Sequence, residues 1–328
     1  MRATPTSAEI ERAAAILRAG GLVAFPTETV YGLGADAANP AAVAKIFAAK
    51  GRPQDHPLIV HLADVAQLPL WAAEIPPAAQ QLAAAFWPGP LTLVLKRAAG
   101  VPDCVTGGQA SVGLRIPGHP VALELLRAFA GEDGGRRYSG VAAPSANKFG
   151  RISPTTAEHV RAELGAVLDC VLDGGECEVG IESTIVDLSR GGAVLLRPGQ
   201  ITPSEIAAVL GADVGSPDAA APRAPGALDS HYAPHTPLYL VPAAELPARL
   251  AALRGRKVAV LARAEAPPGL HEVHWQSAPC ALAGYAHELY ASLRRLDALG
   301  CELILVEAPP AAPGWQGVND RLNRASSR

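Results

Sequence analysis

Three basic residues lie at the end of a helical pattern or inside an apolar stretch, and their positive charge suits them to bind anions. Lys50 and Arg52 follow an apolar helical pattern in the stretch KGRP, and Pro53 stiffens the chain behind them. A lysine point charge and an arginine fork can together hold a polyphosphate, although both residues could instead cap the helix, whose C-terminal end favours cations. Arg115 lies inside the apolar stretch SVGLRIP. A buried charge is unfavourable unless it is paired, so we expect Arg115 to face an anionic ligand or a buried carboxylate.

Polar side chains also follow several β-like runs. The stretch FPTETVYGLG begins at Phe25, APSAN at Ala143, IESTIVD at Ile181 and LRPG at Leu196. Short hydroxyl and amide groups in loops beside strand ends are well placed to contact a substrate, although each stretch alone is equally typical of turns. The sequence has no P-loop. A nucleotide site here would therefore have to hold phosphates with side chains and strand-end loops.

Other short patterns do not support their usual chemistry. GLGADA at 32–37 resembles a dinucleotide-binding motif, in which a helix begins within the motif. Here the next helix signal comes only at Asn39-Pro40, so we predict that residues 32–37 form a turn. Ser145 and Lys148 spell S-x-x-K without the partner motifs of an acyl-serine enzyme. The five cysteines form no C-x-x-C pair. Neither a disulfide framework nor a metal site is expected, and the cysteine usage indicates a reducing, cytoplasmic environment.

Composition narrows the function classes further. The 328 residues are 49% hydrophobic and 18% charged, which is typical of a folded chain of about two domains. A net charge of −3 and only 5% aromatic residues argue against an extended nucleic-acid surface. We expect no signal peptide and no membrane span, because no apolar run reaches the required length of about 20 residues.

Local signals predict interleaved helices and strands. Capping boxes begin helices at Thr6, Thr155 and Thr202, and Asn39-Pro40 begins another that runs to Lys50. The β-like runs are 21–26, 57–62, 91–95, 111–116, 139–143, 168–172 and a hairpin of 183–188 with 193–196. This order predicts an α/β class with a twisted mixed sheet.

The composition of the sequence changes after Gly211, where Ala, Pro and Gly become frequent and hydrophobic periodicity is lost. We predict a first domain over 1–210, an Ala/Pro/Gly-rich linker over 211–237 and a smaller Rossmann-like α/β domain over 238–328. The expected elements of the small domain are strands at 238–241, 258–262, 271–275 and 303–306, and helices near 243–254, 279–299 and 316–326.

Taken together, the motifs resemble the threonylcarbamoyl-AMP synthase family, which has the YrdC-like fold. PTETVYGLG, KGRP followed by HPLIVH, SVGLRIP, APSAN, IESTIVD and LRPG occur in the family's order over about residues 10–210. The linker holds His231-Tyr232-Ala233-Pro234, the HYAP motif of the family's long, two-domain form. The resemblance covers nearly the whole chain.

The resemblance implies an enzyme that makes L-threonylcarbamoyl-AMP from L-threonine, bicarbonate and ATP and releases pyrophosphate. Mg²⁺ is implied as the companion of ATP, with no protein ligand assigned. The product serves N6-threonylcarbamoyl modification of adenosine 37 in tRNAs that read ANN codons. A hand-over to a tRNA threonylcarbamoyltransferase complex is implied as well, with weak or absent direct tRNA contact.

The family's site residues map onto this sequence one by one. The threonine pocket is implied at Thr29, His61, Arg115 and Ser183. The nucleotide side is implied at Lys50, Arg52, His56, Ser111, Ser145, Asn147, Arg151 and Arg197, with Tyr232 closing over the nucleotide. Lys50 and Arg52 are the implied catalytic pair. Position 56 is His where the family has Asn, and position 151 is Arg where Lys is common.

Two other functions remain open on the sequence alone. The same fold could serve as an RNA-binding module with a basic concave surface, which the net charge disfavours. A carbamoyltransferase of hydrogenase maturation would need zinc-finger modules, for which the cysteine spacing is wrong. We also predict that residues 211–237 act as a lid, because a connection of that length is often functional. Alternatively, Tyr232 only anchors the linker to the first domain.

Overall fold

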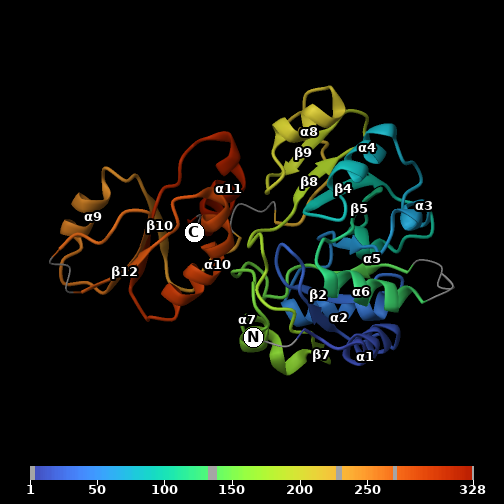
Figure 1. The fold of residues 1–328 in the computed structure, drawn as a ribbon, viewed down its shortest axis with the longest axis horizontal. Helices are drawn as coiled ribbons and strands as arrows, with labels where there is room; N and C mark the ends of the chain where they lie inside the picture. Colours follow the sequence, from blue (N-terminus) through green and yellow to red (C-terminus); the bar gives the residue numbers. More distant parts are fainter. Residues whose placement is uncertain (1–3, 132–138, 227–230, 269–271, 327–328) are drawn as a thin grey trace.

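A computed structural model describes residues 4–131, 139–226, 231–268 and 272–326. They form a larger body from the first part of the chain and a smaller body from the last part, which lie side by side (Figure 1). Helices α10 (Leu282–Asp297) and α11 (Gln316–Ser326) of the smaller body are the elements that face the larger one.

The larger body is built on a mixed sheet. Among the described residues, its nine strands lie in the order β7-β1-β2-β6-β3-β5-β4-β8-β9, with both parallel and antiparallel neighbours. The mixed sheet and the hairpin of β8 with β9 confirm the predicted class. The strands are β1 (Val23–Phe25), β2 (Gly32–Asp36), β3 (Ile59–His61), β4 (Leu91–Lys96), β5 (Ser111–Arg115), β6 (Val141–Ala142), β7 (Cys170–Val171), β8 (Thr184–Asp187) and β9 (Val194–Arg197).

Helices pack around this sheet, and three of the eight described, α1, α2 and α8, begin at the signals seen in the sequence. Thr6 and Thr202 form the predicted capping boxes, and Asn39 caps the helix that Pro40 begins. The third box is wrong by one residue: Thr156, not Thr155, is the cap, and its side chain accepts from the backbone of His159. The helices are α1 (Ser7–Arg18), α2 (Pro40–Lys50), α3 (Leu68–Trp71), α4 (Pro77–Phe86), α5 (Asp103–Thr106), α6 (Pro120–Ala130), α7 (Ala157–Leu164) and α8 (Pro203–Leu210), with 3₁₀ turns at Val65–Gln67 and Gly165–Val167.

The predicted turn at 32–37 is wrong, because residues Gly32–Asp36 form strand β2 in the sheet interior. The glycines serve packing rather than turn formation. A Cβ atom on Gly34 would lie 2.8 Å from the Phe25 ring and 3.0 Å from the Val141 side chain. Gly34 therefore lets the side chains of β1 and β6 close over the strand.

The smaller body is a four-stranded parallel sheet in the order β10-β13-β11-β12, which confirms the predicted small α/β domain. Its elements are β10 (Leu238–Val241), α9 (Leu246–Ala252), β11 (Val258–Ala262), β12 (Val273–Ser277), α10, β13 (Leu303–Glu307), a 3₁₀ turn at Pro313–Trp315 and α11. The strand expected over 271–275 lies two residues later, and residue 271 falls outside the described part.

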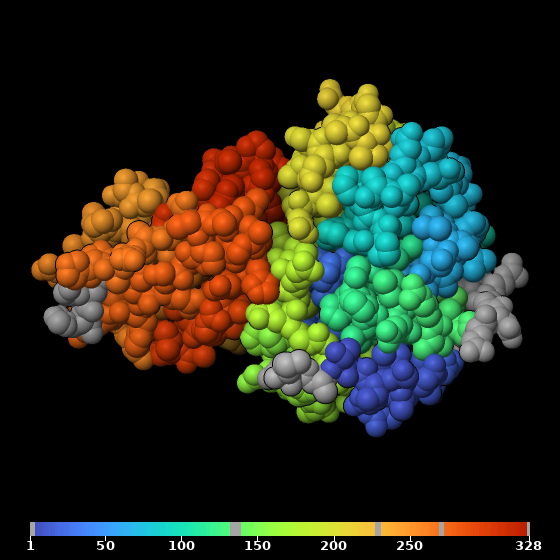
Figure 2. Space-filling model, in the orientation of Figure 1, coloured from blue at the N-terminus to red at the C-terminus, as the bar shows by residue number. Residues whose placement is uncertain are grey.

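Apolar packing joins the two bodies. The main core of the larger body contains fully buried residues only up to Ile206. A second cluster brings Val30, Ile152 and Ile181 of the larger body together with side chains of α10 and α11. Figure 2 shows the smaller body packed directly against the segment around residues 150–210. In the described part of the chain, no helix has both the length and the apolar character of a membrane span.

Candidate active site

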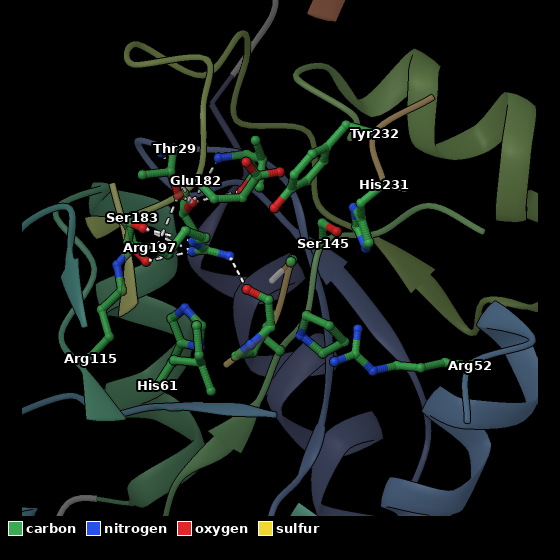
Figure 3. Close-up of a pocket in the computed structure, with 18 residues that line it drawn as sticks. Thr29, Arg52, His61, Arg115, Ser145, Glu182, Ser183, Arg197, His231 and Tyr232 are labelled. Atoms are coloured by element: carbon green, nitrogen blue, oxygen red, sulfur yellow. Dashed lines mark hydrogen bonds between the residues drawn. The ribbon is translucent and has the colours of Figure 1, made fainter. Parts of the chain in front are cut away.

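The strand ends and the linker converge on one narrow pocket with about 50 Å³ of free space (Figure 3). Eight of the thirteen predicted site residues line it: Thr29, Arg52, His61, Arg115, Ser145, Ser183, Arg197 and Tyr232. The other lining residues are Thr27, Val30, Gly32, Ile59, Ala143, Pro144, Glu182, Pro225, Gly226 and His231. The structure therefore brings most of the predicted site residues together at one pocket.

Arg115 occupies one end of the pocket. It ends β5, where it is the register partner of His61 on the parallel strand β3. Its guanidinium lies 2.7 Å from the Glu28 carboxylate and donates to Thr29 Oγ1 at 3.0 Å and to the Gly89 carbonyl at 3.2 Å. The sequence predicted that this buried arginine faces either an anionic ligand or a buried carboxylate, and the structure shows the carboxylate of Glu28. An anion bound here would share Arg115 with Glu28.

His61 lies beside Arg115 and is almost completely buried. Burial, and secondarily the charge of Arg115, lowers the pKa of His61 to about 3. The imidazole is therefore neutral at physiological pH. No described residue forms a hydrogen bond with its Nδ1, so this atom is available to a ligand.

Arg197 and Ser183 form the floor between the two ends of the pocket. Arg197 Nε and Nη2 donate to the Ser183 carbonyl at 3.1 and 2.9 Å, and Nη2 also reaches Ser183 Oγ at 3.1 Å. Arg197 Nη1 donates to the Pro225 carbonyl at 2.9 Å, which ties the linker to β9. The Ser183 hydroxyl is held from behind by Thr92 Oγ1 at 2.8 Å.

Arg52 occupies the opposite end of the pocket and is 7% exposed. It donates to the Pro57 carbonyl at 3.0 Å and lies over the Phe149 ring at 5.7 Å, while its Nε has no partner. Burial lowers the pKa of Arg52 to about 10, so it remains cationic at neutral pH. Among the described residues, no carboxylate forms an ion pair with Arg52 or Arg197. Glu182, which also lines the pocket, interacts electrostatically with Arg197 and offsets part of this buried positive charge. A bound anion would balance the rest.

Lys50 is placed differently from its predicted partner Arg52. Its ammonium does not line the pocket but donates to the backbone carbonyls of Ser145 at 2.6 Å and Asn147 at 2.5 Å. Burial, then the nearby Arg52 charge, holds the pKa of Lys50 well below its usual range. In this geometry Lys50 supports the loop that presents Ser145, and its predicted contact with phosphate would require rearrangement.

The remaining predicted residues surround the pocket without lining it. Asn147 uses its amide to hold the Lys148 and Arg151 carbonyls, and Arg151 reaches the Pro234 carbonyl at 3.3 Å. His56 packs edge-on against Phe149 at 5.3 Å. Ser111 begins β5, at the opposite end of that strand from Arg115. The structure does not bring these four side chains to the pocket wall.

Tyr232 and His231 close the pocket on the Arg52 side (Figure 3). Tyr232 is 1% exposed and adopts a positive φ of 60°, while its hydroxyl has no hydrogen-bond partner in the part of the chain that the structure describes. A Cβ atom on Gly226 would lie 2.0 Å from that hydroxyl, so glycine is required where the linker passes Tyr232. The linker is therefore folded into the site rather than spanning freely between domains.

Glu182 is the main residue that the sequence analysis missed. It lines the pocket, and its carboxylate accepts from Ser153 Oγ, from the Tyr290 hydroxyl at 2.9 Å and from Arg321 Nε at 2.7 Å. Burial alone would raise the pKa of Glu182, but Arg321 and Arg197 outweigh it and hold the pKa at about 2. Its place in IESTIVD was visible in the sequence, whereas its partners Tyr290 and Arg321 lie more than a hundred residues away in the chain.

Comparisons with known proteins agree with this geometry. Residues 15–199 match the Sua5/YciO/YrdC family model, described as "Telomere recombination", and residues 201–327 match the model of the threonylcarbamoyl-AMP synthase C-terminal domain. The chain belongs to this family. It is 40% identical to the threonylcarbamoyl-AMP synthase of Pyrococcus abyssi, over 97% of this chain and 94% of the relative, and 40% identical to that of Bacillus subtilis, over 97% and 93%.

A solved structure of the family has the same arrangement of domains. The crystal structure of P. abyssi Sua5 in complex with L-threonine superimposes with a TM-score of 0.89 at 39% identity, and the match covers 99% of this chain and 96% of that one. Family membership thus extends over both domains, as the order of motifs and the HYAP stretch predicted.

Proposed function

We propose that this chain makes L-threonylcarbamoyl-AMP from L-threonine, bicarbonate and ATP, with release of pyrophosphate. The observation that supports it most directly is the unequal charge along one pocket. Arg115 forms an ion pair with Glu28, whereas no carboxylate among the described residues forms an ion pair with Arg52 or Arg197, and Glu182 offsets only part of the Arg197 charge. A neutral ion pair suits a zwitterionic amino acid, and unbalanced buried cations suit a polyphosphate.

The residues divide between the two substrates accordingly. We assign Thr29, His61, Arg115 and Ser183 to the threonine end; L-threonine is the ligand named for the solved structure of the P. abyssi relative. Arg52, Ser145, Arg197 and Tyr232 form the nucleotide end. Lys50, His56, Ser111, Asn147 and Arg151 are proposed for the nucleotide side as well, either by supporting its loops or after the pocket opens.

The chemistry needs positioning more than a protein nucleophile. Bicarbonate takes up a proton and loses water to give carbon dioxide. The neutral threonine amine then forms an N–C bond to carbon dioxide and releases one proton to water, which gives a carbamate. A carbamate oxygen attacks the α-phosphorus in line. The new O–P bond replaces the bond to the β-phosphate oxygen, and pyrophosphate leaves with that electron pair. Arg52 and Arg197 would neutralise charge on the phosphates as it shifts toward the leaving group.

Mg²⁺ is proposed as part of the substrate, MgATP. The carboxylate on the pocket wall, Glu182, is already engaged by Arg321, Tyr290 and Ser153. Magnesium in nucleotide sites is commonly held by phosphate oxygens and water with few protein ligands, so the phosphates would supply most of its ligands.

The linker is proposed to move during turnover. The pocket has about 50 Å³ of free space, whereas sites for ligands the size of ATP are about 300–1,000 Å³. Tyr232 and His231 would therefore withdraw to admit ATP and return to exclude water from the water-labile mixed anhydride. A chain cut near residue 210 should keep its main core, which ends at Ile206, yet turn over poorly or release degraded product. Unchanged rate and product yield after the cut would argue against the lid.

The biological role is proposed from the family. The product would serve N6-threonylcarbamoyladenosine formation at position 37 of tRNAs that read ANN codons, in the cytoplasm, by hand-over to a tRNA threonylcarbamoyltransferase complex. An RNA-binding module of the same fold is the competing function.

One assay separates the two functions. Purified chain is incubated with ATP, and pyrophosphate is measured with L-threonine and bicarbonate each present or omitted, while mass spectrometry identifies the adenylate. We expect release only when both are present. Release that ignores threonine, or no release together with tight tRNA binding, would favour the alternative.

A further inference from the structure

The C-terminal domain reaches the back of the pocket through a single buried guanidinium. Arg321 of α11 is 1% exposed. Its Nε donates to the Glu182 carboxylate at 2.7 Å, its Nη2 donates to the Glu182 carbonyl at 3.1 Å, and its Nη1 donates to the Pro198 carbonyl at 2.8 Å. One side chain of the second domain thus holds two backbone positions of the first.

Those two positions flank residues of the proposed site. Glu182 directly precedes Ser183, and Pro198 directly follows Arg197. Because β8 and β9 are antiparallel neighbours, Arg321 bridges the open end of this hairpin, where both site residues lie. A change in Arg321 would therefore alter Ser183 and Arg197 together without touching either substrate.

The same region of the second domain also supports the linker tyrosine. The Arg321 guanidinium lies 5.3 Å from the centre of the Tyr232 ring, and the Tyr290 ring stacks on Tyr232 at 5.9 Å with an interplanar angle of 29°. Tyr290 also donates its hydroxyl to Glu182 at 2.9 Å. Glu182, Tyr232, Tyr290 and Arg321 thus form one buried cluster behind the pocket.

We propose that Arg321 and Tyr290 of the C-terminal domain are positioning residues for the reaction, setting Ser183 and Arg197 through the β8–β9 hairpin and setting Tyr232 through its ring. The inference rests on the proposed function for its kinetic readout. It gives the second domain a part in catalysis beyond covering apolar surface.

The charges around Glu182 make it possible to distinguish a positioning role of Arg321 from simple destabilisation of the fold. In the native chain Glu182 is faced by Arg321 from α11, Arg197 from β9, Tyr290 from α10, His231 and Tyr232 from the linker, and Lys50 from α2. Without Arg321, Glu182 would be left as poorly balanced negative charge beside the triphosphate. Removing that carboxylate as well should then recover ATP binding, although it removes one more native contact.

The test compares Arg321→Met with Arg321→Met/Glu182→Gln in the full-length chain. We expect Arg321→Met to lower kcat at least tenfold and to raise KM for ATP at least tenfold, and the double variant to recover ATP affinity at least threefold. The rise in KM for ATP should shrink as pH falls, because protonation of Glu182 removes the same charge. Arg295→Met, a partly exposed arginine on α10 with a 3.8 Å ion pair to Glu288, is the matched control and should stay within twofold of the wild type.

Two gentler variants keep the test decisive if Arg321→Met does not fold. Arg321→Lys retains charge but loses the fork that spans Glu182 and Pro198, so it should affect kcat more than KM for ATP. Tyr290→Phe keeps the ring on Tyr232 and removes only the bond to Glu182, so a two- to fivefold loss in kcat is expected. Folded variants with kinetic constants within twofold of the wild type would overturn the inference.

Failure of the proposed function gives a different result. In that case the wild type itself releases no threonine-dependent pyrophosphate. Calorimetric titration with MgATP then tests the inference separately, since Arg321→Met should still weaken binding at least tenfold relative to Arg295→Met. Equal affinities would overturn it.

Discussion

The two ends of the pocket use the same residue type in opposite ways. At the proposed threonine end, Arg115 is 4% exposed and is balanced by Glu28 at 2.7 Å. At the proposed nucleotide end, Arg52 is 7% exposed and donates to a backbone carbonyl, and its Nε has no hydrogen-bond partner among the described residues. A buried arginine that is paired with a carboxylate is stable without a ligand. A buried arginine without such a pair is stabilised when an anion binds, and this contributes to the free energy of binding. The difference indicates which end should dominate the charge-dependent step.

The largest effect is expected at the unbalanced end. Arg52→Ala should cost about 2–4 kcal/mol of transition-state stabilisation, which is about 30- to 900-fold in rate, because it removes one preorganised charge from the phosphates. Threonine affinity should remain nearly unchanged. The measurement is threonine-dependent pyrophosphate release, with Arg256→Ala in the exposed Arg256–Glu302 pair as the control. Normal turnover of Arg52→Ala would remove this residue from the site.

The balanced end should respond differently, because its arginine has a partner to lose. Arg115→Leu is expected to abolish threonine binding and to leave ATP binding largely intact, as calorimetry would show. It should also lower stability by about 3–5 kcal/mol, because Glu28 becomes an uncompensated buried charge.

The companion variant Arg115→Leu/Glu28→Gln separates these two effects. It should regain much of the lost stability, since no buried charge remains unpaired, but it should still not bind threonine. Loss of ATP binding alone in Arg115→Leu would instead reassign this arginine to the nucleotide.

Tyr232 tests the closure of the nucleotide end. From the sequence, its place in an Ala/Pro/Gly-rich linker suggested that Tyr232→Ala would hardly change Tm. The structure corrects this expectation, because the ring is buried against Tyr290 and Arg321 and truncation of a buried aromatic residue costs about 3–5 kcal/mol.

Tyr232→Phe is the cleaner variant. Its hydroxyl has no protein partner, so Tm should stay within a degree or two, about the shift of a few tenths of a kcal/mol. Retention of ATP and of intact product should still fall several-fold, read from product release in single-turnover experiments. Unaltered retention would leave Tyr232 as an anchor of the linker only.

These cases show which parts of the molecule the sequence could predict. Motifs next to strand ends identified most of the pocket lining, because local signals fix where a strand stops and a loop begins. Helices α4 and α6 were missed although Pro77 and Pro120 occupy the first helical position that correctly predicted α2 at Pro40. A reader of the sequence could have found both.

Contacts between residues that lie far apart in the sequence could not be predicted. Nothing local indicates that Arg115 pairs with Glu28, that Lys50 turns toward backbone carbonyls instead of the pocket, or that Glu182 binds Arg321 in the second domain. Such partners depend on the packing of whole elements against each other. Local patterns therefore indicated where the polar side chains lie, whereas their contacts could be found only from the structure.

The smallest expected effect concerns pH, where the two ends should behave alike. His61 at the threonine end and His231 at the nucleotide end both have a pKa lowered to about 3, mainly by burial. In the unfolded chain each would titrate near about 6.5. The unfolded state thus binds more protons below that pH. The stability linked to these histidines is complete above about pH 6.5 and is lost progressively as pH falls toward about 3.

Catalysis should accordingly show no histidine step near neutral pH, while Tm falls on acidification. His61→Gln and His231→Gln should each flatten the dependence of Tm on pH between about pH 7 and pH 4 relative to the wild type. The exposed substitution His274→Gln should leave that slope unchanged. Equal slopes in all four proteins would mean that groups other than His61 and His231 govern the dependence of Tm on pH in this range.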